Sequence, residues 1–400
     1  MPRFEPFCGV RYASGGDIAA VAAPPYDVVD DHEREVFESN SPHNSIRLIL
    51  PRDVHANGDR YVAASTLLEQ WLTDGTLIID GTARFYGYRM DFDGPDGEHL
   101  HTLGVLGALA VPDVMGEAGV LPHERTIAKA KSDRLDLLRA TRANLDPIWG
   151  LSLTVGFTAL IDTSTPIAHC TDELGVTHTL FAIDNATTIA AITDAVAANP
   201  LVLADGHHRF ETAFNYRNEQ TAAGVVDTGA DAIMALVVEL AEDQLCIQAI
   251  HRLATLPSGF DARAALSDAF TFEPLDSLDA ADGRGAVLID ATGMTLLVPI
   301  DTVVATALEA EAEAARGTDA AVVEHVIKPR WQQAEWVYRH DDNEIVNLVR
   351  NGTYSAGLVL RPATVATTRA AAFAGVRMPQ KTTFFYPKPR TGMVFRTLDS

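Results

Sequence analysis

The sequence predicts a mixed α/β protein of the α+β class that contains either more than one folded unit or one domain with large insertions. Its 400 residues are roughly two to three times the usual size of a single domain. Hydrophobic residues make up 47% of the chain and charged residues 21%, which excludes general disorder, collagen and coiled coil. Short apolar runs of strand length alternate with longer stretches of helical spacing, so both element types are expected.

Residues 1–115 read as an N-terminal mixed α/β region. The Asp-Gly pairs within Asp91–Glu98 lie between two apolar runs and predict a β-hairpin. The remaining patterns predict, in chain order, a helix at Asp31–Glu38, a strand at Ser45–Leu50, a helix at Tyr61–Leu72, and strands at Thr76–Ile79, Arg84–Asp93 and His101–Val111.

Residues 116–255 contain the clearest local pattern of the chain, within Ile183–Glu219. Pro200 separates an acidic-capped helix from a short apolar strand, which runs into a turn and a second helix. Ala230–Leu240 fits either a short helix or a strand. The elements expected here are helices at Asp133–Ala143 and Asp184–Ala198, strands at Ile148–Val155, Thr179–Ile183 and Leu201–Ala204, and a helix that begins at His207 or His208.

The last two parts of the chain are residues 256–330 and 331–400. The first reads as an inserted or appended α/β subdomain with acidic, Ala-rich helices, and the second as a C-terminal region that closes onto the core. The expected elements are helices at Asp261–Phe270 and Thr306–Ala315 around a strand at Ala286–Ile289, then a strand at Ala356–Leu360, a helix at Ala363–Phe373 and a basic, loop-rich end.

The sequence indicates a cytoplasmic protein without a membrane partner. Its apolar runs are far shorter than the roughly 20 residues that cross a bilayer, and charged residues and a proline interrupt Met1–Val10, where a signal peptide is apolar. Cys8, Cys170 and Cys246 are widely spaced and form no CxxC pair, which argues against a disulfide framework and a cysteine zinc site.

The charge distribution favours a small anionic ligand over nucleic acid. The net charge of −23 would repel a polyanion. Residues 121–142 nevertheless carry a net charge of +3, residues 377–396 carry +5 without an acid, and four of the five lysines lie in these two segments. They predict a pocket for a small anionic or phosphorylated metabolite. Pairing with the abundant carboxylates, or chance grouping of so few lysines, remains an alternative.

The ADGHHRFETA motif predicts an anion site. A buried strand ends at Asp205, Gly206 permits a sharp turn, and a helix begins among His207, His208 and Arg209. The N–H groups and positive dipole of a helix start attract anions, and Arg209 offers a fork for phosphate. Alternatively, Asp205 is only an N-cap and the histidines pack or are exposed. A metal held by both histidines is disfavoured, because adjacent helical side chains point about 100° apart.

The PHERTIAKAKSDR segment supplies candidates for acid–base chemistry. Glu124 is the best general-base candidate because the cations around it would hold it ionised, and His123 can titrate near neutrality. Those cations include Arg125, Lys129 and Lys131. A solvated charged helix would give a similar pattern.

Two further segments are candidates for the site. In PPYDV, the prolines hold Asp27 at the end of a rigid loop, which has either a site role or an architectural one. In MPQKTTFFYPK, Lys381 and Lys388 accompany aromatic residues that must be docked, whereas chain ends are normally frayed and polar. A docked basic tail can close a pocket over an anion, and edge-strand packing is the alternative.

Together these segments resemble the family catalogued as domain of unknown function 1015, often labelled ParB-like. The resemblance spans about Phe7–Val394 and rests on PPYDV, PHERT, SDRLDLLRATRANLDPIWGL, ADGHHRFETA, AIHRL and MPQKTTFFYPKPRTGMV. More distantly, NPLVLADGHHRFETA is similar to the ParB and sulfiredoxin superfamily signature, in which a strand, a glycine turn and a G-x-H-R helix start bind nucleotide phosphates. This implies a ParB/sulfiredoxin-like nucleotide-binding core at 116–255. His207 replaces the reactive cysteine of sulfiredoxins, which argues against sulfinic-acid reduction.

The same superfamily includes free-serine kinases, so the resemblance implies a small-molecule phosphotransferase. We expect ATP or ADP and Mg²⁺ as cofactors and a small hydroxylated metabolite, serine first, as acceptor. The implied roles are nucleotide binding for Gly206, His207, His208, Arg209, Arg125, Lys381 and Lys388, catalysis for Glu124 or Asp27 as base with His123, Lys129 and Lys131, and metal binding for Asp205. A ParB-like nucleotide-binding regulatory protein and a phosphate-ester hydrolase remain alternatives.

Overall fold

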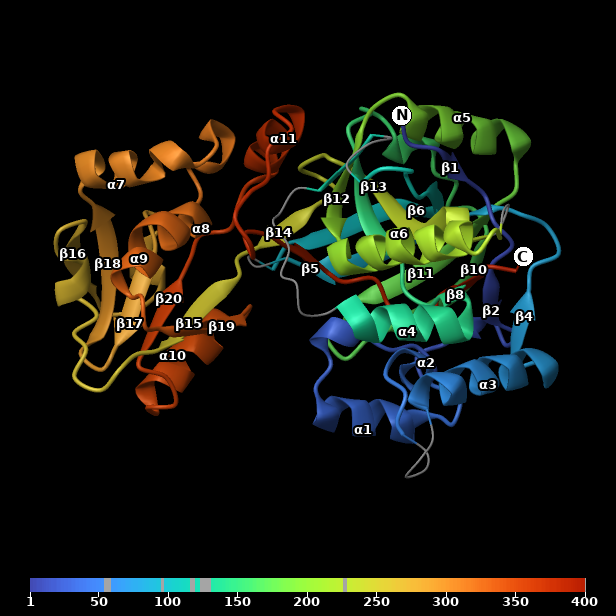
Figure 1. The fold of residues 1–400 in the computed structure, drawn as a ribbon, viewed down its shortest axis with the longest axis horizontal. Helices are drawn as coiled ribbons and strands as arrows, with labels where there is room; N and C mark the ends of the chain where they lie inside the picture. The colour runs from blue at the N-terminus through green and yellow to red at the C-terminus, as the bar shows by residue number, and fades with distance from the viewer. Residues whose placement is uncertain (54–58, 95–96, 116–118, 123–130, 226–228, 400) are drawn as a thin grey trace. The chain divides into compact units, whose positions relative to one another are not determined.

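The computed structural model describes residues 1–53, 59–94, 97–115, 119–122, 131–225 and 229–399 (Figure 1). Helices and strands are interspersed along the chain, and this confirms the predicted mixed α/β class. The chain divides into two compact units. Of the described residues, those up to Cys246 and those from Pro387 onward form the first unit, and Ile247–Tyr386 form the second. The ParB/sulfiredoxin-like core and the four-part division of the chain stay predictions.

The first unit is built on a large mixed sheet with the strand order β3-β10-β11-β5-β6-β13-β9-β12-β7, and β1 pairs with β6. Two small strand pairs, β2 with β4 and β8 with β22, complete its strands. The bounds are β1 (Phe4–Glu5), β2 (Val10–Tyr12), β3 (Gly16–Asp17), β4 (Leu77–Ile79), β5 (Phe85–Asp93), β6 (His99–Ala110), β7 (Val120–Pro122), β8 (Ala143–Asn144), β9 (Ile148–Ser152), β10 (Pro166–Thr171), β11 (Thr177–Ile183), β12 (Leu201–Asp205), β13 (Ala232–Glu239) and β22 (Arg396–Thr397).

Helices α5 and α6 cover the sheet of the first unit, and α6 lies across its strands in Figure 1. Ile192 of α5 and Phe210 of α6 join one buried cluster with Ile233, Ala235 and Val237, which alternate along β13 as one face of a strand does. The helices of this unit are α1 (Asp31–Asn40), α2 (Ile46–Ile49), α3 (Arg60–Thr73), α4 (Lys131–Thr141), α5 (Ala186–Ala197) and α6 (His207–Ala222).

The second unit has its own antiparallel sheet, with the strand order β16-β18-β17-β20-β15-β19, and the separate pair β14 and β21. Its buried cluster includes Leu288, Trp331 and Leu358. The bounds are β14 (Cys246–Gln248), β15 (His251–Thr255), β16 (Phe270–Leu275), β17 (Val287–Asp290), β18 (Gly293–Pro299), β19 (Glu335–Arg339), β20 (Ala356–Val359), β21 (Phe384–Tyr386), α7 (Asp301–Ala307), α8 (Asp319–Val322), α9 (Lys328–Arg330), α10 (Asp342–Arg350) and α11 (Val365–Phe373).

Several element predictions are confirmed and three are wrong. The hairpin of β5 and β6 forms, and Ala230–Leu240 contains the strand β13. The expected strand at Ser45–Leu50 is instead the helix α2, because the Asn44 side chain accepts a hydrogen bond from Ile46 N and donates to two backbone carbonyls of residues 20 and 22.

The helices expected at Asp261–Phe270 and Thr306–Ala315 are reduced mainly to short 3₁₀ turns. In the first, Phe270 pairs with Pro299 as the start of β16. In the second, the buried Glu311 carboxylate contacts His325 Nε2 at 2.9 Å, and α7 ends before it. Tertiary pairing therefore overrides the helix propensity of these Ala-rich stretches.

Within the described ranges, no helix combines the length and the apolar character that crossing a bilayer requires.

Candidate functional site

The predicted strand, turn and helix of the ADGHHRFETA motif are confirmed. β12 pairs with β9 on one side and β7 on the other and ends at Asp205, and α6 begins at His207. Gly206 between them has φ 83° and ψ 26°, a left-handed conformation that favours glycine. A Cβ atom here would also lie only 2.9 Å from the Ile148 side chain and 3.1 Å from its Cα. The junction thus requires glycine for its conformation and for its close approach to β9.

The N-cap residue of α6 is Gly206, which has no side chain with which to cap the helix. Asp205 is therefore not the N-cap, contrary to one of the alternatives from the sequence. Other helices in both units are capped by side chains that accept from their first-turn N–H groups, namely Asp30, Asp59, Asn185, Asp341 and Thr364. At α6 the positive end of the helix dipole is not met by a side chain at the N-cap. His207 and His208 are both partly buried there.

Asp205 binds two cations at the end of β12. Its Oδ1 accepts a hydrogen bond from Lys388 Nζ at 2.7 Å, and its Oδ2 accepts one from Arg209 Nη2 at 2.8 Å. Burial alone would raise the pKa of Asp205, but Lys388 and Arg209 outweigh it and hold the pKa well below the usual range. The carboxylate is ionised, and each of its two oxygens accepts a hydrogen bond from a cation.

Arg209 is held by protein acceptors. Besides its bond to Asp205, it donates from Nη1 to the Pro147 carbonyl at 2.6 Å. Burial would lower the pKa of Arg209, but the carboxylates of Asp205, Asp146 and Asp27 raise it. Its Nε has no hydrogen-bond acceptor within the described part of the chain. Two nitrogens of this guanidinium therefore hold Pro147 and Asp205, and the role of Arg209 in phosphate binding stays a prediction.

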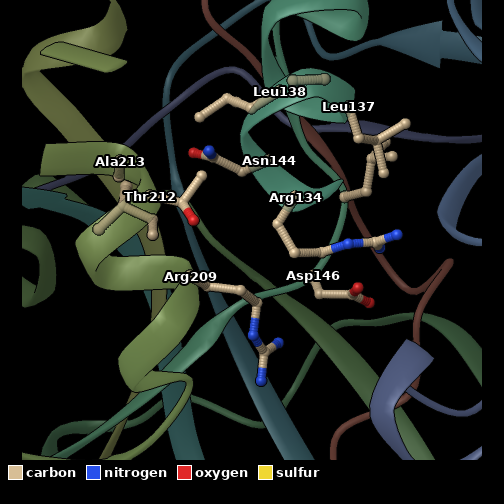
Figure 2. A pocket seen from close by; sticks show the side chains of 11 residues that line it. Arg134, Leu137, Leu138, Asn144, Asp146, Arg209, Thr212 and Ala213 are labelled. Carbon is tan, nitrogen blue, oxygen red and sulfur yellow. The ribbon is translucent and has the colours of Figure 1, made fainter. Parts of the chain in front are cut away.

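A buried carboxylate, Asp146, lies close to this arginine (Figure 2). Asp146 is 8% exposed and accepts a hydrogen bond from the Thr391 hydroxyl. Burial raises its pKa, while the positive charge of Arg209 opposes that shift. The Arg134 guanidinium of α4 lies 4.3 Å from the centre of the Tyr26 ring and donates to a backbone carbonyl of α2. Tyr26, Arg134 and Asp146, from separate stretches of sequence, thus lie near Arg209.

The cavity that these side chains line is small. It measures about 60 Å³ and is bordered by Arg134, Asn144, Asp146, Arg209 and Thr212, together with apolar residues of α4, α6 and β13 (Figure 2). Such a volume holds a few water molecules or a small ion, whereas pockets for drug-sized ligands measure roughly 300–1,000 Å³. This cavity therefore does not accommodate a nucleoside.

The structure brings Asp27 to the same site. It lies in the 3₁₀ turn Tyr26–Val28, is exposed, and its charge acts on Arg209 and on Asp146. Burial raises the pKa of the adjacent Tyr26 hydroxyl.

The remaining predicted residues are not brought to this site by the described part of the structure. His123, Glu124, Arg125 and Lys129 lie outside the described residues. Lys131 begins α4, and its side chain is not described. Lys381 belongs to the second unit, with a left-handed φ of 58°. The roles assigned to these residues stay predictions.

Two residues of the site were missed from the sequence, Asp146 and Thr391. Asp146 precedes Pro147 directly before the apolar strand β9 and reads there as a turn residue. The acidic side chain of Asp146 within an apolar stretch was a usable signal, because a buried carboxylate requires a hydrogen-bond or charge partner.

The described residues do not fit Mg²⁺. Lys388 and Arg209 occupy both oxygens of Asp205. In the part of the chain that the structure describes, no three His, Cys, Asp or Glu side chains are grouped so that they could hold a metal ion.

Several solved structures share a remote similarity with the chain. A mutant free serine kinase in complex with AMP has 8% sequence identity and a TM-score of 0.41, over 70% of this chain and 89% of that chain. A second mutant of a free serine kinase, in complex with ADP, has 9% identity and a TM-score of 0.40, over 70% and 89%. C-terminally truncated SbnI from Staphylococcus aureus has 12% identity and a TM-score of 0.40, over 72% and 85%.

A comparison with curated proteins found no match. The sequence model described as "Protein of unknown function (DUF1015)" matches residues 4–355, which is most of the chain. The protein therefore belongs to the DUF1015 family.

Proposed function

We propose that the protein binds the phosphates of ATP or ADP at the start of α6 and transfers a phosphoryl group to a small hydroxylated metabolite, with free serine as the first candidate. The observation that carries this proposal is the junction of β12, Gly206 and α6, where the N-cap residue has no side chain to cap the helix and Lys388 binds Asp205 beside it. The similarity of NPLVLADGHHRFETA to a nucleotide-phosphate signature supports it. Phosphoryl transfer depends mainly on positioning and charge neutralisation, which this junction offers.

Lys388 and Arg209 have different roles in the proposal. A lysine is a point charge on a flexible stem, so Lys388 can turn from Asp205 towards a phosphate oxygen. Arg209 is fixed by Pro147 as well as by Asp205, and it positions the end of β12. The backbone N–H groups of Gly206, His207 and His208 would meet the phosphates at the positive end of the helix.

The general base would be Glu124 or Asp27, with His123, Lys129 and Lys131 beside the reacting groups and Arg125 and Lys381 on the nucleotide. Asp27 is exposed and carries its charge close to Arg209, which suits a group that exchanges a proton with a bound hydroxyl. No step of the proposal passes through Mg²⁺, since the described residues offer it no site.

The experiment combines binding with product analysis. The purified protein is titrated with ATP and ADP, then incubated with each nucleotide and a panel of hydroxy acids and amino acids, and phosphorylated products are identified by mass spectrometry. Lys388→Met should weaken nucleotide binding about tenfold, because a charge-assisted hydrogen bond contributes roughly 1.5–3 kcal/mol. Lys328→Met is the matched control, because Lys328 pairs with Glu324 on its own helical turn and not with Asp205.

A second variant separates binding from chemistry. Glu124→Gln should lower turnover by about 10² to 10⁴ with nucleotide affinity little changed, because a positioned base acts only on the reaction. Nucleotide binding without any product would favour the ParB-like regulatory alternative. Release of phosphate without an acceptor would favour the hydrolase. No binding of either nucleotide would overturn the proposal.

A further inference from the structure

The first unit contains a second and much larger cavity, an open groove of about 710 Å³ between α1 and the turn that joins β10 to β11. This volume lies in the range of pockets for small molecules. Glu33 and Phe37 line it from α1, Asp172 and Glu173 from the turn, and Arg390 from the C-terminal segment. None of these residues borders the cavity at Arg209.

The buried side chain of Arg390 lines this groove and is held in place by its neighbours. Its side chain is 5% exposed, and Nη1 donates to Glu173 Oε1 at 2.8 Å and lies 3.9 Å from Asp172 Oδ2. The guanidinium carbon lies 5.5 Å from the centre of the Phe37 ring. Its Nε has no acceptor among the described residues, and a buried donor without an acceptor costs free energy. Nε itself is enclosed by protein, so a ligand in the groove would meet the outer nitrogens of the guanidinium.

Asp172 contributes a full negative charge to the same wall. Its Oδ1 accepts from two N–H groups of its own turn, and its Oδ2 contacts His178 Nε2 at 3.1 Å. Tyr88 Oη accepts from Arg390 N, so its hydroxyl hydrogen points to His178 Nδ1 at 2.8 Å. His178 is then a neutral tautomer that carries its proton on Nε2, and burial lowers its pKa.

The charges of the groove therefore do not cancel. Three carboxylates, those of Glu33, Asp172 and Glu173, line the groove with one guanidinium, that of Arg390, and with the His32 imidazole, and the neutral His178 compensates none of the carboxylates. An anion such as phosphate would be repelled, whereas a cation would be attracted. Glu173 is 48% exposed, so an incoming group can reach it from solvent.

We propose that this groove binds a small organic amine that also carries an oxygen acceptor. The ammonium group pairs with Glu173 and Glu33, and the oxygen accepts a hydrogen bond from the Arg390 guanidinium. This inference goes beyond the proposed phosphate chemistry at α6 and does not depend on it, since the two sites use different side chains.

Four compounds of similar chain length test the ligand class: aminobutanol, butanediol, hydroxybutyrate and butylamine. Each is titrated against the full-length protein at low ionic strength, and binding is followed in the ligand NMR spectrum. Aminobutanol should bind roughly fivefold more tightly than butanediol or hydroxybutyrate, because only it combines an ammonium group with a hydroxyl. Butylamine, which lacks the acceptor, should bind more weakly than aminobutanol. Added salt should weaken the binding of both amines.

Two exposed variants test the location. Glu173→Gln and Glu33→Gln should each weaken aminobutanol binding about threefold, since each removes one charge from the groove. Glutamine can keep the capping box that Glu33 forms with Asp30, so α1 is preserved. Glu35→Gln is the matched control on α1, because Glu35 does not line the groove. Equal binding of aminobutanol and butanediol, or unchanged affinity in both groove variants, would overturn the proposal.

Discussion

Lys388 Nζ donates a hydrogen bond to Asp205 Oδ1 at 2.7 Å, although 183 residues of sequence separate the two. Both side chains are largely buried, with exposed fractions of 12% and 22%. Lys388→Met should lower the stability of the first unit by about 1.5–3 kcal/mol, because Asp205 loses a charged partner and keeps only Arg209. Hydrogen exchange of peptides from β12 and α6 measures this loss for the first unit alone.

The control for this prediction is Arg139→Met. Arg139 bonds Asp136 and Glu219, but these groups are about half exposed, and such pairs contribute roughly 0–1 kcal/mol. An equal loss in both variants would show that the Lys388 pair behaves as a surface ion pair.

Asp205 and Asp146 should respond to pH with opposite signs. The folded state lowers the pKa of Asp205, so its contribution to stability is present above the unfolded pKa of about 3.9 and is lost as pH falls through the folded pKa. Burial raises the pKa of Asp146, so folding is favoured below about pH 3.9 and disfavoured as pH rises through the folded pKa.

Substitution by asparagine tests both signs. The destabilisation caused by Asp205→Asn should be greatest near neutral pH and shrink in acid. The free energy of unfolding of Asp146→Asn should rise relative to that of the unsubstituted protein as pH rises. Urea unfolding of each variant from pH 3 to pH 7 (about four pH units) provides the measurement. For each variant, the difference in unfolding free energy from the unsubstituted protein is plotted against pH. Slopes of the same sign for the two variants would contradict the assignment of one stabilised and one destabilised carboxylate.

His251 in β15 should make the second unit sensitive to acid. It is 6% exposed, its Nδ1 accepts from Leu360 N at 3.1 Å, and burial lowers its pKa from 6.5 to about 4. As pH falls from 6.5 to 4, the unfolded chain binds a proton that the folded unit does not, which costs about 3 kcal/mol of stability. In His251→Asn this loss should be absent. The hydrogen-exchange rates of β15 and β20 peptides in the variant and in the unsubstituted protein should therefore become more similar as pH falls towards 4. Parallel pH profiles would exclude His251 as the cause.

Gly206→Ala should destabilise the first unit by more than Gly224→Ala. Both glycines have positive φ, 83° and 75°, so alanine costs about 1–2 kcal/mol at either position. At Gly224 a Cβ would meet nothing within 4 Å, whereas at Gly206 it would press on Ile148. The difference between the two melting temperatures thus measures the stability lost because the added Cβ contacts β9. Equal shifts would mean that β9 moves aside without loss of stability.

The sequence predicted the elements whose own residues determine them. The β5–β6 hairpin has its turn signal within the loop, and the α5–β12–α6 pattern has its cap, strand and glycine turn in consecutive residues. Ser45–Leu50 was misread because its apolar, β-branched run is typical of a strand, while the bonds of Asn44 that start α2 reach carbonyls more than 20 residues away. Local pattern does not contain that information.

The sequence predicted only the part of the candidate site that consists of consecutive residues. The motif around Gly206 was recognised, because strand, turn and helix start are contiguous. The contact of Thr391 with Asp146 joins residues 245 positions apart, and no local spacing indicates it. The bond of Arg209 to the Pro147 carbonyl shows the same limit, because it joins residues 62 positions apart and no local spacing indicates it.

The first unit is discontinuous, and this fixes the order in which it can be completed during synthesis. The ribosome makes β12 well before Pro387–Ser400, the segment that returns to the first unit with Lys388, Thr391 and Arg396. At about 5–20 residues per second, the 183 residues from Gly206 to Lys388 take roughly 10–40 s. During that time Asp205 lacks its lysine, whereas Ile247–Tyr386 of the second unit has emerged without interruption. The nascent chain therefore carries an incomplete first unit until Pro387–Ser400 has been synthesised.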